Sequence, residues 1–435
     1  MARASSAPAD RTTTRATEHR RLGPRPLPLH LTAASLAWTS SRAALPFLRN
    51  GSLPWRPEVR DAAAALRERL ANVDPEAFAR AVDRQIERRL RALAEGILAY
   101  RRHPYRRTLP VPPTLWREGT TRLLDYGATE RAGAARAKAG RRPGPPVLVV
   151  PSLINRAYIL DLTAETSLLR WLAGQGLRPL LVDWDRPGPE ERGFTLTDYI
   201  AGRLETALDA VRETTAAPPL LIGYCMGGLL ALGLALRRRH HLCGLALLAT
   251  PWDFHAESGL QGALAASALA ALGPLIDTLG ELPVDPIQAL FAGLDPQLVA
   301  RKFVAFARLD PTSPKAASFV ALEDWLNDGV PLAAPVAREC LSGWYADNTP
   351  ATGRWRVAGR PVDPARLDLP CLSVIPAQDR IVPPASAAAL AAAIPGAQRM
   401  VPPMGHIGMV VGGRARQQVW RPLLAWLRAR AAGAP

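Results

Sequence analysis

A cysteine lies in a short segment that its neighbours make into a tight turn. Residues 223–228 read Gly-Tyr-Cys-Met-Gly-Gly and directly follow the apolar run 219–222. A strand, a glycine-containing turn and a helix in this order present a nucleophile at the top of a sheet, because the glycines remove side chains that would clash in the strained turn. We therefore predict that Cys225 is a nucleophile. The alternative is a buried cysteine beside a tight turn.

Sulfur at this position indicates one kind of chemistry. The helix expected after Cys225 would place its positive end under the sulfur, which favours the thiolate. A thiolate is a soft nucleophile that can exchange with a thioester. The segment therefore predicts acyl transfer from a carrier thiol rather than hydrolysis of an ester.

A thiol nucleophile needs a base, and the base needs a group that orients it. The chain contains seven histidines. In an α/β-hydrolase the chain order is nucleophile, acid, histidine. His406 satisfies this order, since it lies in the glycine-flanked segment 404–408 after the last expected strand. We predict that His406 is the base; the alternative is a structural histidine in a tight turn.

Two aspartates compete for the orienting position. Asp379 follows the penultimate expected strand, which is the usual position of the acid, and lies between Cys225 and His406 in the sequence. Asp253 follows the strand after the elbow, a position that some proteins of this fold use. We choose Asp379 and expect Asp253 to cap a helix.

An oxyanion formed on a thioester carbonyl needs hydrogen-bond donors that are already in place. One donor is expected to be the backbone N–H of Met226, directly after the nucleophile. The second should come from the turn 151–154, after the strand 147–150, and we take Leu153 as its candidate.

Short apolar runs that end in turns alternate with segments of helical periodicity, which indicates a parallel sheet covered on both faces. The strand pattern stops after residue 253 and returns at residues 371–375 and 399–401. We expect an α/β protein with the α/β-hydrolase fold, an inserted helical cap and an N-terminal helical extension. The first four runs are residues 147–150, 179–182, 220–222 and 245–248.

Asp74-Pro75-Glu76 has the features of a helix start, and an apolar stripe with arginines opposite continues to Ile97. This helix could pack on the catalytic domain or on a partner. The predicted divisions are a flexible basic tail at 1–50, a helical region at 51–115, the first part of the core at 116–253, the cap at 254–364 and the second part of the core at 365–435.

The 435 residues carry a net charge of +16, with 48% hydrophobic and 21% charged residues, as in a soluble globular protein. Because the positive charge is scattered arginine, we predict no nucleic-acid partner.

Four dispersed cysteines indicate a reducing compartment, and their spacing predicts no metal site. We find no apolar core of a secretion signal and no membrane span, so we expect a cytoplasmic protein.

From about residue 95 to the C-terminus the chain resembles polyhydroxyalkanoate synthases, and comes closest to the short, two-subunit (class III-like) type. The segments around Cys225, Asp379 and His406 are similar to the three catalytic segments of that family. The remaining segments that carry the resemblance are 152–162 (Ser-Leu-Ile-Asn-Arg-Ala-Tyr-Ile-Leu-Asp-Leu), 181–184 (Leu-Val-Asp-Trp) and 196–200 (Leu-Thr-Asp-Tyr-Ile).

The resemblance implies polymerisation of 3-hydroxyacyl-coenzyme A through an acyl-Cys225 thioester, with release of coenzyme A and no cofactor. It also implies a second synthase subunit, a homodimer and association with the polyester granule surface. Two alternatives remain: a cysteine-nucleophile thioesterase or esterase with the same triad, and a non-catalytic protein that binds a granule or another surface.

Overall fold

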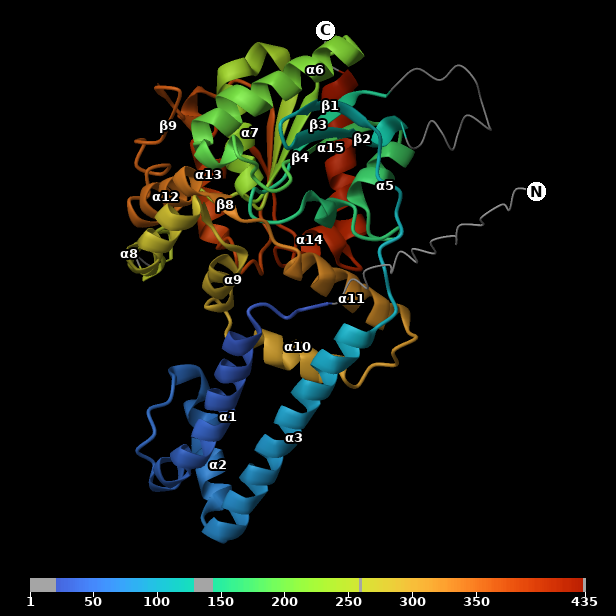
Figure 1. Cartoon of the computed structure of the whole chain (residues 1–435). Helices are drawn as coiled ribbons and strands as arrows, with labels where there is room; N and C mark the ends of the chain where they lie inside the picture. The colour runs from blue at the N-terminus through green and yellow to red at the C-terminus, as the bar shows by residue number, and fades with distance from the viewer. Residues whose placement is uncertain (1–20, 129–143, 258–259, 433–435) are drawn as a thin grey trace, which may run out of the picture.

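Short apolar segments form one mixed sheet at the centre of the protein (Figure 1). The computed structural model describes residues 21–128, 144–257 and 260–432. β1 and β2 are antiparallel to their neighbours, and the other strands run parallel. In sheet order the strands are β1 (Thr114–Glu118), β2 (Thr121–Asp125), β4 (Arg178–Asp183), β3 (Pro146–Val150), β5 (Leu220–Tyr224), β6 (Gly244–Leu248), β11 (Cys371–Val374) and β12 (Gln398–Met400).

Helices cover both faces of this sheet, which is why the central strands are apolar throughout. α6 (Glu205–Thr215) and α7 (Met226–Arg238) pack on one face. α5 (Leu168–Gly174) and α15 (Arg421–Ala432) pack on the other (Figure 1). The expected α/β-hydrolase architecture is therefore present. The sequence interpretation missed the antiparallel strands β1 and β2, which extend one edge of the sheet.

The segment between β6 and β11 is mostly helical and covers the carboxyl edge of the sheet, since residues of α9, α10 and α11 line the same pocket as Cys225. Two very short strands, β7 (Glu281–Leu282) and β8 (Leu332–Ala333), pair within it. Its main helices are α8 (Leu260–Leu279), α9 (Val284–Ala292), α10 (Leu298–Phe306), α11 (Pro314–Asn327), α12 (Ala334–Arg338) and η6 (Glu339–Ala346).

The helical arm before β1 consists of α1 (Leu27–Asn50), α2 (Arg60–Leu70) and α3 (Pro75–Arg102), and extends away from the sheet (Figure 1). Asp74 caps α3 as expected, since its carboxylate accepts hydrogen bonds from the backbone N–H groups of Glu76 and Ala77. α3 packs against α1 and against α10 of the cap.

The prediction of a flexible tail over residues 1–50 was wrong for residues 27–50. These residues form α1, which buries Ala34 and Trp38 in a cluster with Leu93 of α3 and Phe303 of α10. Burial of one apolar face stabilises a helix more than its intrinsic propensity does, and the partners of that face are distant in sequence. Residues 1–20 lie outside the described part of the chain.

Within the described ranges, no helix combines the length and apolarity that crossing a membrane requires. In the same residues, no group of three or more His, Cys, Asp or Glu side chains is arranged to hold a metal ion.

Candidate active site

Cys225 lies at the sharp turn between β5 and α7, with backbone angles φ 57° and ψ -129°. Its N–H donates to Leu248 O at 2.8 Å, and its carbonyl accepts from Gly228 N at 2.9 Å. A positive φ is unusual for a residue with a side chain and often marks a functional site. The turn therefore has the geometry of a nucleophile elbow.

Close backbone packing explains two glycines of the elbow. A Cβ added at Gly223 would lie 2.7 Å from Gly227 O, and one added at Gly228 would lie 2.6 Å from Thr250 Cγ2. Both positions therefore require a residue without a side chain. This packing lets β5 turn directly into α7 and leaves the thiol of Cys225 at the pocket surface.

The structure brings His406 and Asp379 together from the loops after β12 and β11. His406 Nδ1 donates to Asp379 Oδ2 at 2.7 Å, and both residues are buried. Asp379 Oδ1 accepts from the backbone N–H groups of Ile381 at 2.8 Å and Val382 at 2.9 Å. These bonds hold the carboxylate as an acceptor, so the imidazole has a defined tautomer and orientation.

Cys225 lines the same cavity as His406. Burial acts to lower the pKa of His406, but the negative charge of Cys225 and the hydrogen bonds with Asp379 and Cys225 outweigh it and raise the pKa to about 10. The ring of Tyr224 packs 5.2 Å from the imidazole, and its hydroxyl donates to His406 O at 3.2 Å. Of the three residues that the sequence indicated, Asp379 and His406 are therefore hydrogen-bonded, and Cys225 lines the same cavity as His406.

Asp253 is engaged elsewhere. Its Oδ1 accepts from His255 N at 2.9 Å and from Asn348 Nδ2 at 2.8 Å. The expected capping role is not seen, because α8 begins only at Leu260. Asp253 instead ties the chain after β6 to the turn that holds Asn348.

The two expected oxyanion donors come from the start of α7 and from the turn after β3. Met226 is the first residue of α7, where a backbone N–H has no acceptor within its own helix. In the turn after β3, Ile154 N donates to Ser152 Oγ at 3.2 Å, so its amide is already engaged. The side chain of Leu153 is buried in the core. Met226 and Leu153 stay our candidates for the oxyanion hole.

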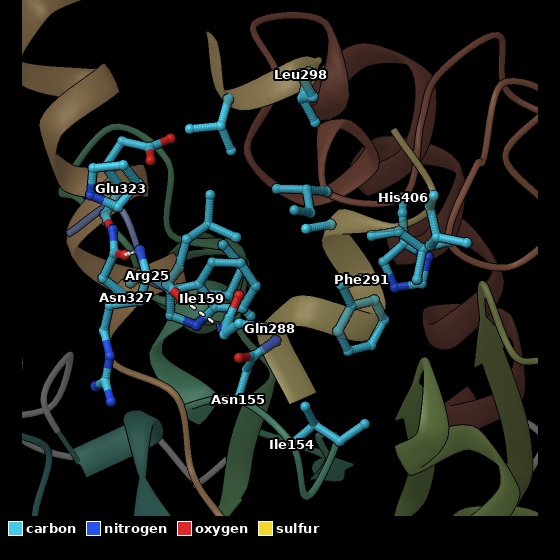
Figure 2. Close-up of a pocket in the computed structure, with 18 of the residues that line it drawn as sticks. Arg25, Ile154, Asn155, Ile159, Gln288, Phe291, Leu298, Glu323, Asn327 and His406 are labelled. Carbon is cyan, nitrogen blue, oxygen red and sulfur yellow. Dashed lines mark hydrogen bonds between the residues drawn. The ribbon is translucent and has the colours of Figure 1, made fainter. Parts of the chain in front are cut away.

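A cavity of about 460 Å³ opens beside Cys225 and His406. Near the triad its wall is apolar and includes Phe291, Leu298 and Ile407. Figure 2 shows Arg25, Glu323 and Asn327 on the side of the pocket opposite His406. The cavity lining is therefore mostly apolar, with a few polar side chains on the side away from His406.

Comparison with known proteins agrees with this geometry. A profile described as alpha/beta hydrolase fold matches residues 145–412. A poly(3-hydroxyalkanoate) polymerase subunit PhaC from Synechocystis sp. is 30% identical over 66% of this chain and 78% of that protein. This chain belongs to the poly(3-hydroxyalkanoate) polymerase family of the α/β-hydrolase fold. The subunit of the same name from Allochromatium vinosum is 29% identical over 66% of this chain and 81% of that protein. The one from Haloarcula marismortui is 27% identical over 73% of this chain and 68% of that protein.

The fold profile includes Cys225, Asp379 and His406 of this polymerase-family chain, but it begins only at residue 145, after the helical arm. The arm nevertheless reaches the pocket, since Pro24, Arg25 and His30 line the same cavity as Cys225. Sequence reasoning missed these three residues. No local motif marks them, because their place in the pocket depends on contacts with the cap.

Proposed function

We propose that this protein is an acyltransferase that polymerises 3-hydroxyacyl-coenzyme A through a thioester on Cys225. The observation that carries the proposal is the hydrogen bond between His406 and Asp379 at a cavity that Cys225 also lines, with Cys225 at a nucleophile elbow. The names of the relatives support the same activity.

In the first half-reaction, the proton of the Cys225 thiol passes to His406, whose raised pKa lets it hold that proton. The sulfur attacks the thioester carbonyl, and the oxyanion forms opposite the N–H groups of Met226 and Leu153. The bond from the carbonyl carbon to the sulfur of coenzyme A then breaks, and His406 returns the proton to the departing thiolate. The product is an acyl-Cys225 thioester, formed from another thioester at little cost in free energy.

In the second half-reaction, the hydroxyl of another 3-hydroxyacyl unit loses its proton to His406 and attacks the acyl-Cys225 carbonyl. An ester bond forms, the bond to Cys225 sulfur breaks, and the proton on His406 neutralises the thiolate. Asp379 keeps the imidazole oriented in both halves. The cap limits the access of water to the acyl-enzyme, so that a hydroxyl rather than water accepts the acyl group.

We also propose a second synthase subunit, a homodimer and association with the polyester granule surface. Support comes from the relatives, which are named as subunits of a polymerase. Light scattering of the purified protein, alone and with a co-purified partner, measures these assemblies directly.

The test of the activity uses purified protein and 3-hydroxybutyryl-coenzyme A. We expect free coenzyme A to appear together with insoluble polyester. Coenzyme A matched by an equal amount of soluble 3-hydroxybutyrate would instead identify a thioesterase.

Cys225→Ala should abolish both covalent acylation and coenzyme A release. The matched control is Cys243→Ala. Cys243 is half-buried, its thiol donates a hydrogen bond to Pro218 O, and it directly precedes β6, away from the proposed triad. Turnover that persists in Cys225→Ala would remove this sulfur from the mechanism.

A further inference from the structure

The turn after β3, residues 151–156, contains Leu153, whose backbone N–H is the candidate second oxyanion donor. A segment of the cap, residues 325–330, contacts this turn, and we call it the cap junction. In the last turn of α11, Trp325 donates from its indole N–H to Arg156 O at 2.7 Å. Trp325 is only 4% exposed, so water competes little for this bond.

The other end of the cap junction bonds the same turn through its backbone. Val330 N donates to Ile154 O at 3.0 Å, and Gly329 pairs with Asn155 as an isolated antiparallel bridge. Ile154 and Asn155 also line the cavity beside Cys225 (Figure 2). Together with the indole bond, these contacts tie three consecutive residues of the turn to the cap.

The start of the turn is held by the core instead. Trp184 Nε1 donates to Pro151 O at 3.1 Å. A Cβ added at Gly227, in the first turn of α7, would lie 2.5 Å from the same oxygen, so the turn packs directly on the helix that follows Cys225. One end of the turn is therefore fixed by the core and the other by the cap.

Leu153 lies between these two attachments. A backbone donor stabilises an oxyanion only when it already points at the place where the negative charge develops. A displacement of about 1 Å in a reacting site can cost on the order of a hundredfold in rate. Release of the turn from the cap should therefore affect the transition state much more than the binding of substrate.

We propose that the cap junction positions the second oxyanion donor, and that Trp325 is the positioning residue through its bond to Arg156 O. This inference rests on the proposed function for the acyl-transfer reaction. It gives the cap a part in the chemical step, in addition to covering the pocket.

The experiment removes the indole donor and keeps an aromatic ring in its place, with Trp325→Phe in the full chain. The matched control is Trp355→Phe. Trp355 belongs to the same cap and is 5% exposed, and its indole N–H has no hydrogen-bond partner within the described ranges. If Trp325→Phe does not fold, Val330→Pro tests the same idea, because it removes the N–H that bonds Ile154 O.

The first measurement is release of coenzyme A from 3-hydroxybutyryl-coenzyme A. We expect kcat to fall about tenfold or more in Trp325→Phe, with little change in KM, because a donor that is out of place weakens only the transition state. Both constants should stay close to those of the parent protein in Trp355→Phe.

Two analogues of the substrate separate positioning from a general structural role. A thioether of coenzyme A has no carbonyl, whereas a trifluoromethyl ketone accepts the sulfur of Cys225 at its carbonyl carbon and becomes a hemithioketal oxyanion. Trp325→Phe should bind the ketone about tenfold more weakly than the parent protein does, and the thioether equally well.

Equal losses of affinity for both analogues, or an unchanged kcat in folded Trp325→Phe, would overturn the inference. Selective loss of ketone binding, in a parent protein that releases soluble 3-hydroxybutyrate instead of polyester, would retain the cap junction and refute the proposed polymerisation.

Discussion

The two sides of the pocket are held in place by different kinds of contact. On the triad side, Cys225 follows β5 directly, and Asp379 and His406 lie in the loops after β11 and β12. Their positions depend on neighbouring strands of one sheet and on tight turns with backbone hydrogen bonds. On the other side, which we call the strap side, Pro24, Arg25 and His30 line the cavity. Their segment is held by side-chain pairs such as Arg21 with Asp324, which are 303 residues apart.

This difference predicts how each side should respond to substitution. The sheet positions the reacting groups through its backbone, which is rigid and insensitive to most side-chain changes. The strap side depends on a few polar contacts, each of which contributes modestly. Changes on the triad side should therefore abolish turnover, whereas changes on the strap side should mainly lower stability.

The largest effect is expected on the triad side, from Asp379→Asn. Because an amide cannot hold the imidazole in the same tautomer, kcat should fall by roughly 10³- to 10⁴-fold. Steady-state release of coenzyme A measures the loss. The matched control is Asp253→Asn, which should retain most of the activity because Asp253 bonds His255 and Asn348 instead. The opposite ranking would assign the orienting role to Asp253.

A stability effect is expected from Arg178→Met. Arg178 Nη2 and Asp125 Oδ2 pair at 2.7 Å, with side chains 6% and 5% exposed, between β4 and β2. Removing the cation beside a buried carboxylate should cost about 3–5 kcal/mol of unfolding free energy. Denaturant unfolding measures this change. Arg91→Met, on the exposed face of α3, is the control and should cost less than about 0.5 kcal/mol.

The pH dependence of stability provides a further test of the triad. The pKa of His406 is raised in the folded protein to about 10, from an ordinary value of 6.5. A raised pKa stabilises the folded state fully below pH 6.5, and this contribution is lost as the pH rises through about 10. The difference in Tm between the parent protein and His406→Gln should therefore be constant at low pH and shrink between these limits. A difference that grows over this range would contradict the protonated imidazole.

The smallest effect is expected on the strap side, from Tyr100→Phe. This change removes the hydroxyl that donates to Asp324 at 2.9 Å and should cost about 1 kcal/mol. Release of coenzyme A from 3-hydroxybutyryl-coenzyme A should stay close to that of the parent protein, because Tyr100 is not among the residues that line the cavity. Thermal unfolding and the coenzyme A assay measure both. A clear fall in kcat would show that the two sides of the pocket are coupled.

Much of the core was predictable because its signals are local. Apolar runs marked β3 to β6, β11 and β12, and the glycines beside Cys225 marked the elbow. Asp379 and His406 were predicted from their order in the chain. The strands β1 and β2 were missed, because short alternating segments at the edge of a sheet resemble loops until a neighbouring strand pairs with them.

By itself, the sequence determined which residues are available for catalysis and where the strands that precede them end, because turn geometry and burial periodicity depend on adjacent residues. Only the tertiary structure decided that α1 is a helix and that Pro24, Arg25 and His30 line the cavity beside Cys225. Residues such as Arg25 acquire this place through contacts with Asn327 and Asp285, more than 250 positions away. Contacts at that separation leave no local pattern in the chain.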